Sequence, residues 1–105
     1  MAGKKPLKNR IIQQLPIGDI IPNPRNAKKH SDEQIVQIVS SIREWGWTNP
    51  ILIDIFAGNI IIAGHGRRLA AMKIWESPNP EIKFPDGTFL EKNCSHLDQT
   101  YLYLH

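Results

Sequence analysis

One stretch near the middle of the chain restricts its fold more than any other. It reads IIIAGHGRRLAAMK over residues 60–73: three isoleucines, a glycine-containing turn, two arginines and then good helix formers. β-branched residues favour a strand, glycine permits a tight turn, and Leu, Ala, Met and Lys favour a helix. The stretch therefore predicts a strand–turn–helix unit, and with it a small fold that combines helices with a sheet.

The same turn gathers groups that bind anions. Amides at the start of a helix carry partial positive charge, and Gly64 and Gly66 let the backbone approach a ligand closely. Arg67 and Arg68 add planar donors that suit phosphate oxygens. A phosphate site and an ordinary strand-to-helix turn with solvent-facing arginines both fit this pattern, because a short Gly-x-Gly is a weak signal.

A short strand and a capped helix are expected before this unit. Residues 15–21 predict a brief edge strand, because the prolines that follow exclude a central one. Ser31 and Gln34 have the form of a capping box, which predicts a helix from Ser31 onward. Gly46 is expected to end that helix as a left-handed cap. The helix has one apolar stripe, which consists of Ile35, Ile38, Val39, Ile42 and Trp45.

One hairpin is expected before a second helix and another after it. Residues 50–56 and 60–62 are apolar runs around Ala-Gly-Asn, which predicts a β-hairpin. The second helix is predicted over residues 67–75. The Ser-Pro-Asn-Pro segment that follows, at residues 77–80, is expected to end it. Further along, Pro-Asp-Gly at residues 85–87 resembles a hairpin turn, and residues 101–105 form either a strand or an unpacked tail.

Length and composition indicate one ordinary globular domain. The chain has 105 residues, enough for a single domain at residues 11–105 after a disordered basic arm at residues 1–10. It has no apolar run long enough to cross a membrane and no signal peptide, so a cytoplasmic location is expected. The single cysteine, Cys94, excludes an internal disulfide. The formal net charge of +3 is a mild bias toward anionic partners.

Three further residues are candidates for chemistry. His65 fits a general acid or base, a metal ligand, a hydrogen-bond donor to a nucleotide, or a structural role in the turn. A nuclease or NTPase would use His65 together with Asp54. Arg25 follows the rigid segment Pro-Asn-Pro, which would hold its guanidinium facing the arginine turn, so that both would bracket one polyanion. Cys94 and His96 have no second pair at a zinc spacing, so no metal site is expected.

Three segments, in this order, resemble the N-terminal domain of the ParB/sulfiredoxin-like superfamily. They are IIPNPRN at residues 20–26, SIREWGWTNPILI at residues 41–53 and IAGHGRRLAA at residues 62–71, and the likeness covers roughly residues 15–75. The resemblance implies a small α/β (α+β) domain with a short mixed sheet and two or three helices. The form of the turn is most similar to ParB-like domains attached to the N-terminus of phage and bacterial DNA methyltransferases.

The resemblance also implies a nucleotide triphosphate against the turn. The ligand is CTP with Mg²⁺ in ParB-like members and ATP in sulfiredoxin. ParB proteins usually carry Glu-Arg-Arg where this chain has His65-Gly66-Arg67, and sulfiredoxin needs a cysteine at His65, so binding is expected rather than hydrolysis or thiol repair. The expected ligand-binding residues are Gly64, His65, Gly66, Arg67, Arg68 and Arg25.

The sequence thus predicts a ParB-like domain that binds a nucleotide triphosphate or nucleic-acid phosphate. It would act in a DNA-related process, which is partitioning, transcription regulation or DNA modification. Nucleotide and DNA are the expected partners, Mg²⁺ with CTP or ATP the expected cofactor, and a homodimer stays open. The alternatives are a ParB-like nuclease or NTPase that uses His65 and Asp54, a degenerate interaction module, or the truncated N-terminal part of a DNA methyltransferase.

Overall fold

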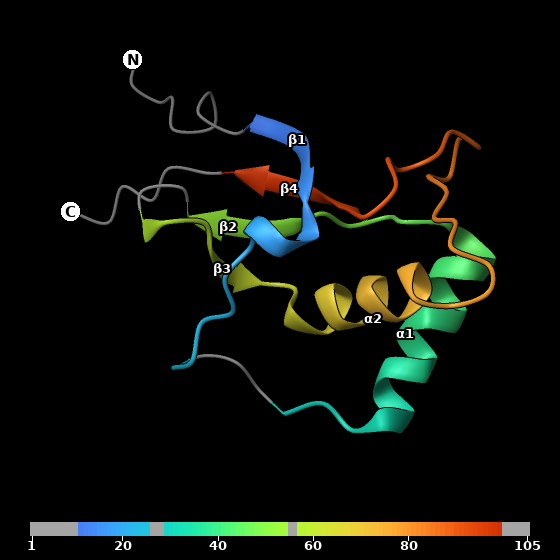
Figure 1. Ribbon diagram of the computed structural model, residues 1–105, viewed down its shortest axis with the longest axis horizontal. Helices are drawn as coiled ribbons and strands as arrows, with labels where there is room; N and C mark the ends of the chain where they lie inside the picture. The colour runs from blue at the N-terminus through green and yellow to red at the C-terminus, as the bar shows by residue number, and fades with distance from the viewer. Residues whose placement is uncertain (1–10, 26–28, 55–56, 100–105) are drawn as a thin grey trace, which may run out of the picture.

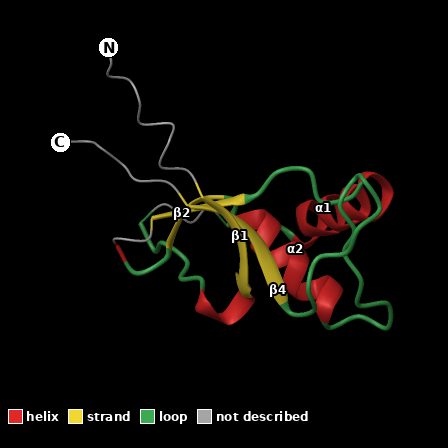
Figure 2. Cartoon of the chain, turned by 90° about the horizontal axis from the view of Figure 1, so that it is seen from above, coloured by secondary structure: helices red, strands yellow, loops and turns green. Residues whose placement is uncertain are grey.

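A mixed sheet of four strands forms the framework of the domain (Figure 1). The computed structural model describes residues 11–25, 29–54 and 57–99. In spatial order the strands are β1 (Ile11–Pro16), β4 (Cys94–Gln99), β2 (Ile51–Asp54) and β3 (Ile60–Ala63). The helices are α1 (Asp32–Trp45) and α2 (His65–Trp75), and Figure 2 shows both to one side of the strands. The predicted fold class, a small α/β domain with a short mixed sheet, is confirmed.

β1 lies at the edge of the sheet, but it shares only residues 15 and 16 with the edge strand that was expected at residues 15–21. It pairs antiparallel with β4, and the last paired residue is Pro16, which faces Cys94. A 3₁₀ turn, η2 (Ile17–Asp19), then redirects the chain. The turn takes the chain away from β4, and Ile20 enters the core with only 1% of its surface exposed.

β4 was not predicted, although it lies in the middle of the sheet. It reads CSHLDQ, which has no β-branched residue and no apolar alternation. It pairs antiparallel with β1 and parallel with β2. Backbone hydrogen bonds on both sides therefore make this segment a strand, and its own side chains give no sign of it.

α1 begins as its capping box predicts. The Ser31 hydroxyl accepts from the Gln34 N–H at 3.2 Å, and the Gln34 side chain accepts from the Ser31 N–H at 3.0 Å. Ile35 and Ile42 are buried, but Trp45 is 65% exposed, so its expected place in the apolar stripe is wrong.

The chain leaves α1 through Gly46 and buries the next tryptophan instead. Gly46 has φ 88° and ψ 177°, so the predicted left-handed cap is wrong in ψ and right in the sign of φ. A Cβ there would lie 3.0 Å from the backbone of Lys83. Trp47 follows and is 2% exposed. The close approach of residues 83–85 and the extended ψ turn the chain so that Trp47, and not Trp45, fills the core.

The hairpin and the second helix form the predicted strand–turn–helix unit. β2 and β3 are antiparallel; of the run expected at residues 50–56, residues 55–56 lie outside the described part of the chain. α2 begins at His65, two residues before the expected start. The reason is that Gly64 alone, at φ 106° and ψ 24°, reverses the chain, so His65 and Gly66 already belong to the helix.

The segment after α2 folds back as the predicted hairpin. Phe84 N–H donates to Thr88 O at 2.7 Å, and Leu90 N–H donates to Ile82 O at 2.8 Å. The basic arm expected at residues 1–10 and the tail at residues 101–105 lie outside the described residues. Within the described part, neither helix has the length and apolar character needed to cross a membrane.

Candidate functional site: a cavity at the start of α2

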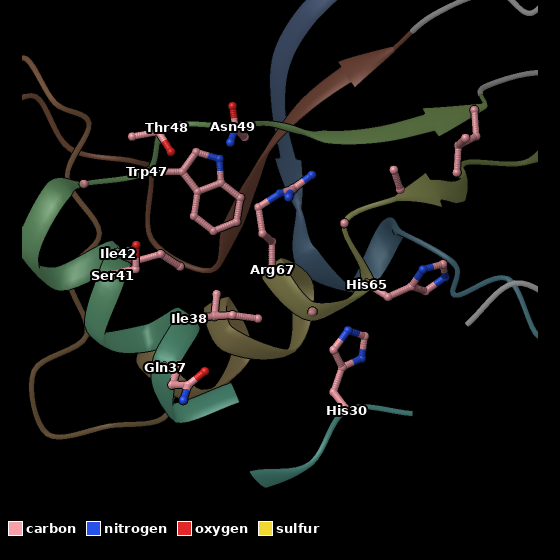
Figure 3. Close-up of a pocket in the computed structure, with 15 residues that line it drawn as sticks. His30, Gln37, Ile38, Ser41, Ile42, Trp47, Thr48, Asn49, His65 and Arg67 are labelled. Atoms are coloured by element: carbon pink, nitrogen blue, oxygen red, sulfur yellow. The ribbon is translucent and has the colours of Figure 1, made fainter. Parts of the chain in front are cut away.

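A cavity of about 610 Å³ opens between α1, the segment after it, β3 and the start of α2 (Figure 3). None of the described residues that line it carries a carboxylate. Its lining therefore offers cationic and neutral polar groups with no built-in negative charge. The polar or ionisable side chains among them are His30, Gln37, Ser41, Trp47, Thr48, Asn49, His65 and Arg67.

A bulge in the sheet shapes one wall of this cavity. Leu52 pairs with Ala63 and Ile53 pairs with Ile61, so Ile62 is an extra residue with no partner on β2. Such a bulge bends the strand and changes where its side chains point. Ile62 and Ala63 both line the cavity, directly before the residue that starts α2.

The backbone at the start of α2 supplies free donors. The first helical hydrogen bond runs from Arg68 N–H to Gly64 O at 3.0 Å. The preceding amides, at residues 65–67, have no acceptor within a helix, and no side chain caps this end. All three of these residues line the cavity. The positive end of the helix dipole and its unpaired N–H groups therefore face a space that a ligand can enter.

The two glycines of the turn have different roles. Gly64 has a positive φ that other residues rarely adopt, and a Cβ there would lie 3.0 Å from Arg67 Nη2. Gly66 is a helical residue whose Cβ would lie only 2.9 Å from Ile38 Cδ1 and 3.0 Å from His30 Nε2. Gly64 thus makes the turn, whereas Gly66 lets α2 pack closely against α1.

Arg67 lies inside the cavity rather than in solvent. Its Nη2 donates to Pro50 O at 3.2 Å, while its Nε is buried and has no hydrogen-bond partner. Burial lowers the pKa of the guanidinium from its ordinary value. Within the described part of the chain no carboxylate pairs with it, so the cation is partly desolvated and lacks a counter-charge.

Trp47 adds a second donor without a partner in the same cavity. Its ring is almost fully buried, and its Nε1 has no acceptor among the described residues. Figure 3 shows the indole beside the Arg67 side chain. Buried polar groups normally have hydrogen-bond partners, so these two donors mark a place suited to an acceptor. No motif in the sequence singles out Trp47 as part of this site.

His65 points away from the cavity, toward the segment that follows η2 (Figure 3). Its Nε2 accepts a hydrogen bond from the Asn23 N–H at 3.1 Å. Burial, followed by the charges of His30 and Arg68, lowers the pKa of His65. The imidazole is therefore neutral with its proton on Nδ1, and its Nε2 lone pair is already engaged.

His30 is a site residue that no motif in the sequence indicated. It precedes α1, its ring lies against Gly66, and its Nδ1 is buried without a partner. Figure 3 shows its imidazole directed at the start of α2. Only the packing of α1 on α2 brings it there.

The remaining sequence candidates lie outside the cavity lining. Arg68 is half-buried, and its Nε has no partner. Arg25 is exposed, and its N–H donates to Asn23 Oδ1 at 3.0 Å. Asp54 pairs with Ile60, the first residue of β3, whereas Gly64 follows the last residue of that strand. The tertiary structure thus places Gly64, His65, Gly66 and Arg67 at the cavity and keeps Asp54 away from it.

Comparison with known proteins agrees with this architecture. Residues 1–83 match the ParB N-terminal domain family. Over 56 residues the chain is 52% identical to the ParB-like nuclease domain-containing protein YnaK of Escherichia coli (strain K12). That match covers 53% of this chain and 62% of the relative's length. No solved structure matches the chain. The family match spans most of the chain and contains the cavity, and the chain belongs to the ParB N-terminal domain family.

Proposed function

We propose that this ParB-like domain binds the phosphate groups of a nucleotide triphosphate, CTP or ATP, or of nucleic acid in the cavity at the start of α2. The domain would thereby act in a DNA-related process such as partitioning, transcription regulation or DNA modification. One observation carries the proposal: Arg67 is a partly desolvated guanidinium in a cavity with no carboxylate in its lining.

The state of Arg67 favours an anionic ligand on energetic grounds. Withdrawing a charge from water is costly unless an opposite charge compensates it. A phosphate compensates that cost, and its oxygens match the geometry of the guanidinium. The free amides of residues 65–67 add donors from the positive end of a helix to the same anion.

The size and lining of the cavity fit a nucleotide better than a lone phosphate. Small-molecule sites typically enclose roughly 300–1,000 Å³, and this cavity has about 610 Å³. Beyond the phosphate end, the lining combines apolar side chains with the Trp47 indole N–H and the neutral polar side chains of Thr48 and Asn49. Such groups suit the sugar and base of a nucleotide.

The residues present do not fit a magnesium ion held by the protein itself. Magnesium sites usually use one or two carboxylates together with phosphate oxygens. The cavity offers only hydroxyl and amide side-chain oxygens, at Gln37, Ser41, Thr48 and Asn49. The negative charge of the ligand would therefore be met by Arg67 and the helix amides.

Calorimetry and thermal shift with CTP, ATP, GTP and tripolyphosphate test the proposal. The wild-type domain should bind at least one of these and melt at a higher temperature with it. Arg67→Ala should weaken binding about tenfold or more, the size expected for losing a charge-assisted hydrogen bond. Arg67→Lys should fall in between, because it keeps the charge and loses the planar fork.

The matched control is Lys73→Ala. Lys73 is exposed in the last turn of the same helix, so this variant removes the same charge far from the cavity. Its affinity should equal that of the wild type. Binding that survives in a folded Arg67→Ala variant, or no binding of any of these ligands or of DNA to the wild type, would contradict the proposal.

A nuclease is the second candidate, because the related protein YnaK is named a ParB-like nuclease domain-containing protein. The geometry gives it less support, since Asn23 occupies Nε2 of His65 and Asp54 lies outside the cavity lining. Incubation of supercoiled plasmid with divalent metal ions tests it. Cleavage that disappears in His65→Ala would favour the nuclease over a binding domain.

A further inference from the structure

We propose that His65 is a positioning residue: through the backbone of Asn23 it holds Arg25 beside the start of α2, where Arg25 contacts the second phosphate of a polyphosphate ligand. This inference rests on the proposed function, because it assigns a part in phosphate binding to Arg25, which lies outside the cavity lining, and to His65, whose ring points away from the cavity. It requires a fixed connection from His65 to Arg25, and that connection is visible in the structure.

The segment before Arg25 is fastened along β3. Ile21 N–H donates to Asn59 O at 3.0 Å, and Ile61 N–H donates to Ile21 O at 2.9 Å. These bonds form a parallel bridge between Ile21 and Ile60, the first residue of β3. The segment therefore follows the edge of the sheet toward the end of β3, where α2 begins.

Asn23 connects this segment to the helix. It lies between Pro22 and Pro24, neither of which has an N–H, so Asn23 provides the only backbone N–H of the three residues. That donor goes to His65 Nε2 at 3.1 Å. Asn23 Oδ1 in turn accepts the Arg25 N–H at 3.0 Å. Two hydrogen bonds of Asn23 thus connect the imidazole of His65 to the backbone of Arg25.

Arg25 is placed to contact a ligand that extends out of the cavity. Two residues span at most about 7 Å, so its backbone stays close to the imidazole that anchors Asn23. Its side chain is exposed and forms no hydrogen bond or ion pair with another described residue. A ligand with one phosphate at the start of α2 and another outside would meet this guanidinium, whereas a single phosphate would not.

The state of His65 controls this connection. A protonated imidazole has two N–H donors and no acceptor, so it cannot hold the Asn23 N–H. Burial is the largest cause of its lowered pKa, followed by two ionisable groups that face it, His30 from the segment before α1 and Arg68 from α2. The lowered pKa keeps the acceptor available at neutral pH. Acid should release the segment that carries Arg25.

A double-mutant cycle measured with tripolyphosphate tests the inference. In the wild-type background Arg25→Ala should weaken binding about threefold to fivefold, as for a partly exposed ion pair. In the His65→Ala background the same substitution should change affinity by less than about 1.5-fold, because Arg25 is no longer held. With inorganic monophosphate, Arg25→Ala should have no effect in either background.

His65→Gln is the conservative control. Its side-chain oxygen can accept the Asn23 N–H, so the effect of Arg25→Ala should return. That effect should then no longer depend on pH, whereas in the wild type it should shrink as the pH falls. A merely structural role for His65 would lower affinity equally with and without Arg25 and would show no such pH dependence.

¹⁵N NMR separates this inference from the proposed function. The neutral His65 should carry its proton on Nδ1, and the Asn23 amide resonance should shift in His65→Ala. A proton on Nε2, or equal effects of Arg25→Ala in both backgrounds, overturns the inference even if tripolyphosphate binds. A wild-type domain that binds neither tripolyphosphate nor any of the nucleotides or DNA overturns the proposed function and the role of Arg25, while NMR still decides whether His65 holds Asn23.

Discussion

At the scale of single residues, identical amino acids in the turn have unlike tasks. Gly64 allows a backbone conformation, and Gly66 allows two helices to come close. Arg67 lies in the cavity with a lowered pKa, whereas Arg68 does not line it. From the sequence alone, all four residues are expected to belong to one phosphate-binding loop. Their contacts in the structure show that the two glycines, and likewise the two arginines, have different surroundings.

Substitution of Gly66 by alanine should destabilise the domain. The added methyl group would lie 2.9 Å from Ile38 Cδ1 and 3.0 Å from His30 Nε2. Overpacking of this kind costs roughly 1–3 kcal/mol, which urea denaturation can measure. Gly18→Ala is the control, because nothing lies within 4 Å of a Cβ there. Equal stability of the two variants would show that α1 and α2 are not packed as closely as described.

At the scale of elements, local signals account for some segments and fail for others. α1 carries its own capping box, and the residues that satisfy it are three apart in the sequence. β4 carries no comparable signal and becomes a strand because β1 and β2 pair with it from both sides. A local pattern therefore defines the helix, while distant neighbours define the strand.

Loss of the α1 cap should weaken the domain by a modest amount. Ser31→Ala removes the hydroxyl that accepts the Gln34 N–H, which typically costs about 1 kcal/mol. Ser40→Ala, on the exposed middle of α1, is the control and should be neutral or slightly stabilising because alanine is the better helix former. The measurement is the free energy of unfolding in urea. No difference between the two variants would argue against the cap.

At the scale of the whole molecule, the sheet, both helices and the connecting segments meet at one cavity. Its walls come from parts of the chain far apart in sequence, from His30 to Arg67. Their common property is a surplus of donors and cationic groups without a carboxylate. Two expectations, one about divalent metal ions and one about acid, concern the intact domain.

Removal of divalent metal should leave ligand binding almost unchanged. No described residue that lines the cavity has a carboxylate to hold an ion, so the contacts to a phosphate would come from Arg67 and the helix amides. Calorimetry with tripolyphosphate in EDTA and in Mg²⁺ should give affinities within about twofold of each other. A loss of tenfold or more in EDTA would mean that a metal ion is part of the site.

Acid should destabilise the domain through His65. Its pKa in the folded state lies below the ordinary 6.5, so the unfolded chain binds the proton more tightly. The stabilisation is present above pH 6.5 and is lost as the pH falls through the lowered pKa. Melting temperatures should therefore drop further in acid for the wild type than for His65→Gln. A constant difference between the two across that range would exclude this contribution.

The sequence by itself determined the local elements of this domain. The capping box placed α1, and the isoleucine runs around Ala-Gly-Asn placed the β2–β3 hairpin. The segment at residues 60–73 correctly predicted a strand, a turn and a helix. These elements depend on propensity, capping and turn residues, which act over a few neighbouring positions. They can therefore be predicted from the amino-acid sequence.

Only the tertiary structure decided where the side chains of the turn lie and what they contact. It directed Arg67 into a cavity, turned His65 away toward Asn23, and brought His30 against Gly66 from a distant part of the chain. It also buried Trp47 in place of Trp45. Burial and hydrogen-bond partners depend on which segments pack together in space, and no spacing along the chain specifies them.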